Sequence, residues 1–293
     1  MSTKTSAVRV KKILVPTDFS EISLAALDYA ARIAKRDDGE ILLLHVIESY
    51  MENSIIDMRV DYTEIIEKGI ENKFNEIKLK NKNLEGVTIR SKVVLGKIHA
   101  EIDQIAAQEN IRLIIMGTHG VSGRTNIGKF ILGSNAYRTI GNAPCPIITL
   151  REAPRRKEIK NIVVPLDSTK ASTEKLDVAI RWAKFFDAKI HLLAVTAFFE
   201  EYIVDVKTVT EKVHAAEKRL VKAGVEYHAK IVRHKAPSEA VMEYAIKSNA
   251  DLIFIVTGQE SQLSEMLFGS SARNIISDST IPVMSINIKK YQG

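Results

Sequence analysis

Two segments of the sequence combine residue types that could hold a phosphorylated ligand. The first, Val15 to Ser20, follows a short apolar run and ends at a serine that can begin a helix. It carries Asp18, whose carboxylate could accept hydrogen bonds from an adenine amine or a ribose hydroxyl. An aspartate at this place could equally cap the following helix, so the residue types alone leave both roles open.

The second segment is rich in glycine and runs from Met116 to Asn135. It has four glycines within twelve residues, and the pair Gly133-Ser134 follows at the expected start of a helix. Glycines let backbone N–H groups turn toward phosphate oxygens, and a helix N-terminus carries partial positive charge. The segment therefore predicts a phosphate-binding loop, although a plain surface loop would have a similar composition. It matches neither the P-loop nor the GxGxxG pattern.

The spacing of histidine, cysteine and carboxylate residues indicates no catalytic or metal site. His119 lies beside a glycine turn, where an imidazole is expected to form a structural hydrogen bond. His45 and His191 fall in apolar runs and are expected in the sheet. The single Cys145 lies between two prolines and is expected to be a buried thiol, which fits a reducing compartment. HExxH and CxxC are absent from the sequence, so no metal ligands are predicted.

The elements that would position these segments alternate between short apolar runs and helical periodicity. Strands are predicted over residues 13–16, 41–46, 87–95, 111–116 and 147–150. Helices are predicted over residues 20–35, along a stripe of Ile66, Ile70, Phe74 and Ile77, over 98–108 and from Ser134. Continuous apolar strands separated by helices indicate a Rossmann-like α/β domain, a five-stranded parallel sheet flanked by helices. Ligands of such sheets bind beyond the carboxyl ends of the strands, where both segments lie.

The sequence contains this pattern twice. Residues 11–46 align with residues 160–195 without a gap, and 17 of the 36 positions are identical. Ordinary composition would give about two or three identities by chance. Gly133-Ser134 recurs as Gly269-Ser270. We therefore predict two tandem domains, residues 1–153 and residues 154–293.

The second copy of the glycine-rich segment is degenerate. Val256 stands at the position of Gly117, and Gln259 stands at the position of Gly120. A valine does not readily adopt a positive φ, and the neighbouring Glu260 would bring negative charge near phosphates. Asp167 persists at the position of Asp18. The intact ligand site is therefore expected in the first domain.

Composition and charge limit the classes of function. The chain has 293 residues, of which 45% are hydrophobic and 27% are charged, as in ordinary globular proteins. Residues 1–153 carry 21 basic and 19 acidic residues and the remainder carries 21 and 17, so neither half is basic enough to predict nucleic-acid binding. Apolar runs are too short to span a membrane and the N-terminus lacks a signal core, so a cytoplasmic protein is expected.

Three motifs together resemble the universal stress protein family. They are Pro16-Thr17-Asp18-Phe19-Ser20, the run Leu-Leu-His-Val-Ile ending at Ile47, and the run Ile-Ile-Met-Gly-Thr-His-Gly ending at Gly120. The resemblance extends over both halves and implies the adenine nucleotide alpha hydrolase-like fold. It also implies that ATP or another adenine nucleotide is the ligand, with Mg²⁺ arriving on the nucleotide; AMP and a coenzyme A derivative stay open. Single-domain relatives commonly dimerise through their last strands, so the two halves are expected to pair within the chain, with a homodimer as a further option.

The resemblance also implies roles for particular residues. Asp18 and the backbone of Val46 would meet the adenine, with Pro16 and Thr17 beside them. The ribose and phosphates would be lined by Met116, Gly117, Gly120, Gly133, Ser134 and Asn135, with His119 close by. In ATP-binding members the pattern is glycine, two residues, glycine, nine residues, glycine, then serine or threonine. Gly120, Gly123, Gly133 and Ser134 fit it, whereas a start at Gly117 leaves twelve residues before Gly133, so the register stays open.

Three functions are compatible with these features. The favoured one is a nucleotide-responsive binding module that acts as a stress-response switch. The second is a slow ATPase or phosphotransferase, for which Arg124, Lys129 and His119 are present but no recognisable base. The third is a scaffold that has lost its ligand and acts through its paired domains, which the intact Gly117 and Gly120 disfavour.

Overall fold

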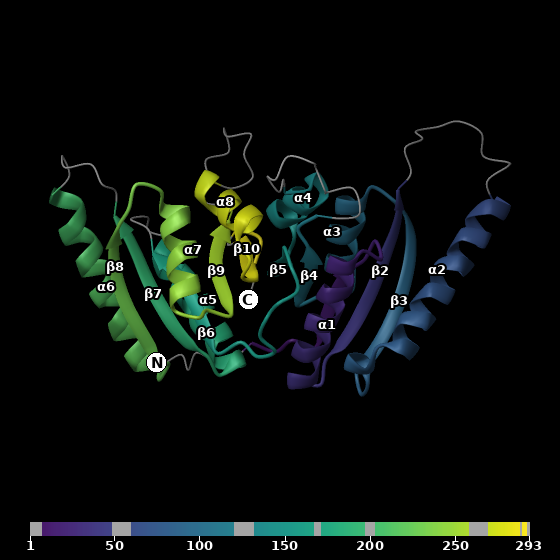
Figure 1. Ribbon diagram of the computed structural model, residues 1–293, viewed down its shortest axis with the longest axis horizontal. Coiled ribbons are helices and arrows are strands. Elements are labelled where there is room, and N and C mark those ends of the chain that lie inside the picture. The colour runs from purple at the N-terminus through teal and green to yellow at the C-terminus, as the bar shows by residue number, and fades with distance from the viewer. Residues whose placement is uncertain are drawn as a thin grey trace.

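The computed structural model describes residues 8–48, 60–119, 132–166, 171–196, 203–257, 269–287 and 289–291. In these parts of the chain, two α/β units lie side by side and share one sheet (Figure 1). Within the same residues, no helix combines the length and the apolar character that a membrane span requires.

The first unit alternates strands and helices in the predicted order. Its elements are β1 (Lys12–Pro16), α1 (Glu21–Arg36), β2 (Glu40–Glu48), α2 (Val60–Lys80), the 3₁₀ turn η1 (Lys82–Leu84), β3 (Thr88–Gly96), α3 (Ile98–Gln108), β4 (Leu113–Gly117), α4 (Ser134–Asn142) and β5 (Ile147–Leu150).

The second unit repeats this order. Its elements are β6 (Asn161–Leu166), α5 (Ala171–Phe186), β7 (Lys189–Thr196), α6 (Ile203–Ala223), β8 (Tyr227–Arg233), α7 (Pro237–Lys247), β9 (Leu252–Thr257), α8 (Ser270–Asp278) and β10 (Val283–Asn287).

The helix signals in the sequence are confirmed at their termini. The side chain of Ser20 accepts a hydrogen bond from the backbone N–H of Ser23 and so caps α1. Helix α4 begins at Ser134, directly after Gly133. The predicted stripe on α2 is partly wrong, because Phe74 is fully buried whereas Ile66 is 48% exposed. The stripe therefore faces the sheet only toward its C-terminal end.

The sheet contains ten strands in the order β3-β2-β1-β4-β5-β10-β9-β6-β7-β8 among the described residues. Neighbouring strands are parallel within each unit, and β5 pairs with β10 in an antiparallel ladder that joins Ile148 to Met284. The predicted pairing of the two last strands within one chain is thus observed. Alternate residues of the strands point to opposite faces of the sheet and form two core layers. One layer packs beneath α1, α2, α5 and α6, and the other packs beneath α3, α4, α7 and α8. Cys145 is buried in the second layer, and burial raises the pKa of its thiol to about 12.

Contacts between the two units include a buried hydrogen bond at the end of α4. The side-chain amide of Asn287 on β10 donates to the carbonyl of Gly141 at 2.8 Å. Nearby, the ammonium of Lys290 donates to the carbonyl of Asn142 at 3.0 Å from an exposed position. The last turn of α4 is therefore held by residues of the second unit.

Replacing Asn287 with alanine is expected to lower the free energy of unfolding by about 1–2 kcal/mol, because the buried carbonyl of Gly141 loses its partner. Lys290→Ala is the matched control, since an exposed substitution is expected to change stability by at most about 0.5 kcal/mol. Chemical denaturation of both variants measures the difference. Equal and small effects would show that the junction does not depend on this bond.

Asp103 of α3 places an acidic group near the same junction. Its Oδ1 is buried and has no hydrogen-bond partner among the described residues. Burial raises the pKa of the Asp103 carboxyl to about 7, and the positive charge of Lys290 opposes that shift. The carboxyl therefore favours the folded state at low pH, where it is protonated.

This contribution to stability should fade as pH rises. An acid with a pKa higher in the folded than in the unfolded chain loses its stabilising contribution between about pH 4, its unfolded value, and about pH 7. The Asp103→Asn variant should therefore gain in Tm relative to the original protein across that interval. Thermal unfolding at several pH values measures the difference, and a pH-independent difference would contradict the expectation.

Candidate functional site

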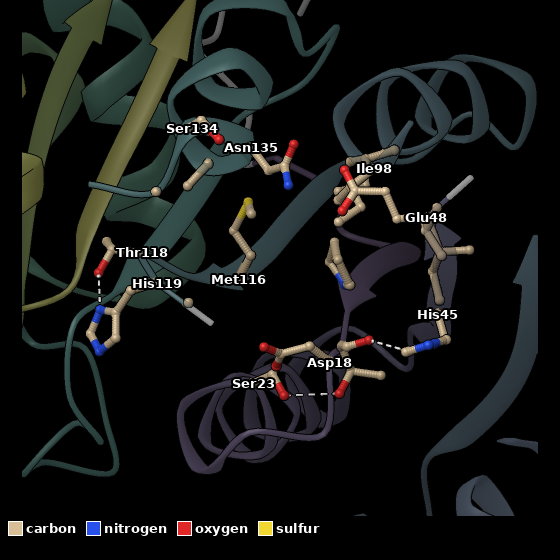
Figure 2. Close-up of a pocket in the computed structure, with 18 of the residues that line it drawn as sticks. Asp18, Ser23, His45, Glu48, Ile98, Met116, Thr118, His119, Ser134 and Asn135 are labelled. Carbon is tan, nitrogen blue, oxygen red and sulfur yellow. Dashed lines mark hydrogen bonds between the residues drawn. The ribbon is translucent and has the colours of Figure 1, made fainter. Parts of the chain in front are cut away.

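A cavity of about 610 Å³ opens beyond the carboxyl ends of β1, β2 and β4 (Figure 2). Strand β1 lies between β2 and β4, so the chain turns to one side of β1 first and to the other side later. This is the point of an open parallel sheet where the strand order reverses and where ligands bind. The lining residues are Pro16, Thr17, Asp18, Ser23, Leu44, His45, Val46, Glu48, Ile98, Ile102, Met116, Gly117, Thr118, His119, Leu132, Gly133, Ser134, Asn135 and Ala136.

The predicted site residues that the structure describes all line this one cavity. They come from the end of β1, the end of β2, the end of β4 and the start of α4. The two remaining members, Gly120 and Gly123, lie outside the described residues, as do Arg124 and Lys129. The structure therefore brings the described set together, while the register of the glycine pattern and the ligand roles stay predictions.

The carboxylate of Asp18 is exposed at the cavity and is oriented by its own loop. Its Oδ1 accepts hydrogen bonds from the backbone N–H of Ser20 at 3.1 Å and from the hydroxyl of Ser20 at 2.5 Å. The cap of α1 is Ser20 itself. Of the two roles that the sequence left open, the structure excludes the helix cap, and the ligand role of Asp18 stays a prediction.

The backbone before Asp18 is tied to β2. The N–H of Thr17 donates to the carbonyl of Leu44 at 2.8 Å. The carbonyl of Thr17 lies 2.7 Å from Nδ1 of His45, and a carbonyl can only accept, so Nδ1 carries the proton. His45 was expected in the sheet, and its contact with this loop was not anticipated.

Glycine at position 117 is required by space rather than by its dihedral angle. The described glycines with positive φ are Gly86 and Gly224, so Gly117 has an ordinary φ. A β-carbon on Gly117 would lie 2.9 Å from Cγ2 of Ile22 and 3.2 Å from the carbonyl oxygen of His119. The prediction that this position requires a positive φ, which valine does not readily adopt, is therefore wrong, because the restriction at Gly117 is steric.

The start of α4 forms the side of the cavity that faces Asp18 (Figure 2). Gly133 is the residue before the helix, and no side chain caps this end. The first-turn N–H groups of a helix have no acceptor within the helix and carry partial positive charge. Ser134 and Asn135 in this turn thus add polar groups to an end of α4 that favours an anion.

Several lining residues were not singled out from the sequence. Glu48 follows Val46 by two positions on β2, and residues two apart share one face of a strand. That spacing could have identified Glu48 once Val46 was assigned. An apolar side of the cavity is formed by Ile98, Ile102 and Leu132. These residues belong to separate segments, and no local sequence pattern identified them as part of a site. His119 makes the expected local contact, with its Nδ1 at 3.0 Å from the hydroxyl of Thr118.

The corresponding region of the second unit differs. Val256, at the position of Gly117, is a buried residue of β9 that pairs with Ile286. Helix α8 begins at Ser270 after Gly269, as α4 begins after Gly133. Asp167 and residues 258–268 lie outside the described residues. Among the described residues of the whole chain, no group of three His, Cys, Asp or Glu side chains could hold a metal ion.

Comparisons with known proteins agree with this fold. The model of the Universal stress protein family matches residues 9–151 and again residues 158–287. Universal stress protein MJ0577 of Methanocaldococcus jannaschii is 32% identical over 161 residues, which are 50% of this chain and 97% of that protein. Universal stress protein Slr1230 of Synechocystis sp. is 22% identical over 298 residues, covering 94% of this chain and 99% of that protein.

A solved structure resembles the chain over both units. The crystal structure of a universal stress protein from Archaeoglobus fulgidus has a TM-score of 0.72 and 22% sequence identity, and the match covers 95% of this chain and 97% of that one. At this identity the likeness concerns the fold, including both of its halves. Together with the two family matches, it shows that this chain belongs to the universal stress protein family and contains two tandem copies of its domain.

Proposed function

We propose that the first domain binds an adenine nucleotide, with ATP as the leading candidate, and that its occupancy switches the associations of the protein under stress. The observation that carries this proposal is the convergence of the residues predicted from the sequence, which come from four separate chain segments, on one cavity. Its volume of about 610 Å³ lies within the range of about 300–1,000 Å³ for small-molecule sites. The resemblance to nucleotide-binding members of the family supports an adenine nucleotide as the ligand.

The two sides of the cavity suit the two ends of a nucleotide. On one side Asp18 presents an oriented carboxylate, an acceptor for the amine of adenine or a hydroxyl of ribose. On the other side the start of α4 presents backbone N–H groups, which favour phosphate oxygens. The apolar Ile98, Ile102 and Leu132 complete the lining and suit the faces of a purine. Mg²⁺ would enter with the phosphates of ATP.

A switch requires that the bound nucleotide favour one of two states of the protein. Helix α4 offers a physical connection, because its first turn lines the cavity and its last turn is held by Asn287 of the second unit. The helix is nine residues long, so its two ends are about 13 Å apart. A small displacement of α4 on binding would therefore reach the interface between the units.

Mass spectrometry of small molecules released from the purified protein tests the ligand class directly. The proposal expects an adenine nucleotide near one equivalent per chain, and the released mass distinguishes ATP, AMP and a coenzyme A derivative. Phosphate release by the same preparation is expected to be slower than one turnover per minute, as for a binding module. An empty protein that also shows no saturable ATP binding would contradict the proposal and favour the scaffold.

A further inference from the structure

Phe19 has a backbone conformation that is unusual for its residue type. Its φ is +64°, in the left-handed region. The other described residues with positive φ, apart from glycines, are Asp38, Asn110, Asp187 and Asn249. Aspartate and asparagine adopt this conformation readily, whereas a bulky aromatic residue does so only when its surroundings enforce it. Some contact must therefore hold Phe19 in place.

Three side chains contact the ring of Phe19. Its ring stacks on the imidazole of His45, with centroids 4.9 Å apart. It also lies 5.5 Å from the ring of Phe74, a fully buried residue of α2. The ammonium of Lys73, the preceding residue of α2, lies 4.5 Å from the centroid of the Phe19 ring. The strained backbone is thus maintained by contacts from β2 and α2.

The strained residue separates Asp18 from the groups that orient it. The N–H and hydroxyl of Ser20 hold the Asp18 carboxylate, and the chain bends at the intervening Phe19, whose φ is positive. The N–H of Phe19 donates to the hydroxyl of Thr17 at 3.0 Å, which closes the turn. A change of the Phe19 backbone from positive to negative φ would move Ser20 away from Asp18.

We propose that Phe19 is the positioning residue for Asp18, and that α2, through Lys73 and Phe74, thereby controls the affinity of the cavity for its ligand. This inference rests on the proposed function, because it concerns how the same site is held ready. The position of helix α2 would then affect ligand affinity through contacts that do not involve the glycine-rich segment.

The duplication provides an internal comparison. The second half keeps the acid, as Asp167, but has Ser168 at the position of Phe19 and Ala194 at the position of His45. The stacked pair is therefore present in the half with the intact glycines and replaced in the half with degenerate ones. The second half thus has the same fold without the stacked pair, so the fold does not require the pair. Its presence beside the intact glycines fits a role in ligand binding.

Three variants at position 19 separate positioning from packing. Phe19→Ala removes the ring contacts and keeps the β-carbon, so the left-handed conformation stays unfavourable and is no longer held in place. Phe19→Gly removes the same ring but adopts positive φ without penalty. Phe19→Leu keeps apolar volume without the aromatic contacts and serves if the smaller variants unfold. ATP binding is measured by calorimetry on the full chain at a temperature well below the Tm of each variant. Each position-19 variant is measured alone and in combination with Asp18→Ala.

Positioning predicts that Phe19→Ala weakens ATP binding nearly as much as Asp18→Ala, about tenfold. The double variant should be no weaker than either single one, because both remove the same interaction. Phe19→Gly should bind about fivefold to tenfold more tightly than Phe19→Ala. Where the smaller variants unfold, the same non-additivity with Asp18→Ala is expected of Phe19→Leu.

Two results would overturn this inference, and they have different meanings. Additive losses for Phe19 and Asp18, or equal affinities for the alanine and glycine variants, would show that Phe19 only packs, while the proposed function survives. If the original protein binds no ATP, the inference and the proposed function both fail. His45→Asn provides a further check, since its amide can donate to Thr17 as Nδ1 does, and it should bind more tightly than His45→Leu.

Discussion

Replacing Asp18 with alanine is expected to weaken ATP binding at least about tenfold, because a hydrogen bond to a charged group contributes about 1.5–3 kcal/mol. The carboxylate is exposed at the cavity and is held by Ser20, so it meets a ligand without prior rearrangement. Isothermal titration calorimetry of the full chain measures the change. Asp18 is exposed and does not cap α1, so we expect only a small change in Tm, and thermal unfolding of the variant separates that change from the loss of affinity.

Asp167→Ala is the matched control for this prediction. It removes the equivalent acid from the second half, where Val256 and Gln259 replace two glycines of the first half. We expect ATP affinity in this variant to stay within about twofold of the original, because the ligand site lies in the other domain. A larger loss from Asp167→Ala than from Asp18→Ala would place the ligand site in the second domain and contradict its assignment to the first.

Replacing Gly117 with valine should have a second large effect. The added β-carbon would stand 2.9 Å from Ile22 and 3.2 Å from the carbonyl of His119, and two methyl groups would extend beyond it. Both the entry to the glycine-rich segment and the side chain of Ile22 must then shift. Since a displacement of about 1 Å is enough to lose well-aligned polar contacts, we expect at least about a tenfold loss of ATP affinity.

A compensating substitution tests the steric reason. Gly117→Ala alone should weaken binding less than the valine variant, because it adds the β-carbon without the two methyl groups that extend beyond it. Combining Gly117→Ala with Ile22→Ala opens the space and should restore part of the affinity. Without recovery in the double variant, a clash with Ile22 would not explain why glycine is required at this position.

Local signals in the sequence predicted the elements well. Ser20 before an apolar-periodic stretch, and Gly133-Ser134 before a short one, both marked true helix starts. These signals concern capping and backbone freedom, which depend on a few neighbouring residues. The same argument applies to Cys145, whose burial follows from the apolar run that it precedes.

Features that depend on distant segments could not be predicted in this way. The strain at Phe19 depends on His45 and on Phe74, which follow it by 26 and 55 positions in the printed sequence. The steric requirement at Gly117 depends on Ile22, a residue of another element. Periodicity indicates which face of an element is buried but does not identify the side chain that it meets. The pairing of β5 with β10 was likewise expected only from the resemblance to dimeric relatives.

Calorimetric titration of the intact, nucleotide-free chain with ATP measures both whether a nucleotide binds and how many sites the chain has. We expect saturable binding with a stoichiometry of one ATP per chain, because the first half has the intact glycine-rich segment and the second half has Val256 in place of Gly117. Absence of binding at millimolar ATP, or two equivalent sites per chain, would contradict it.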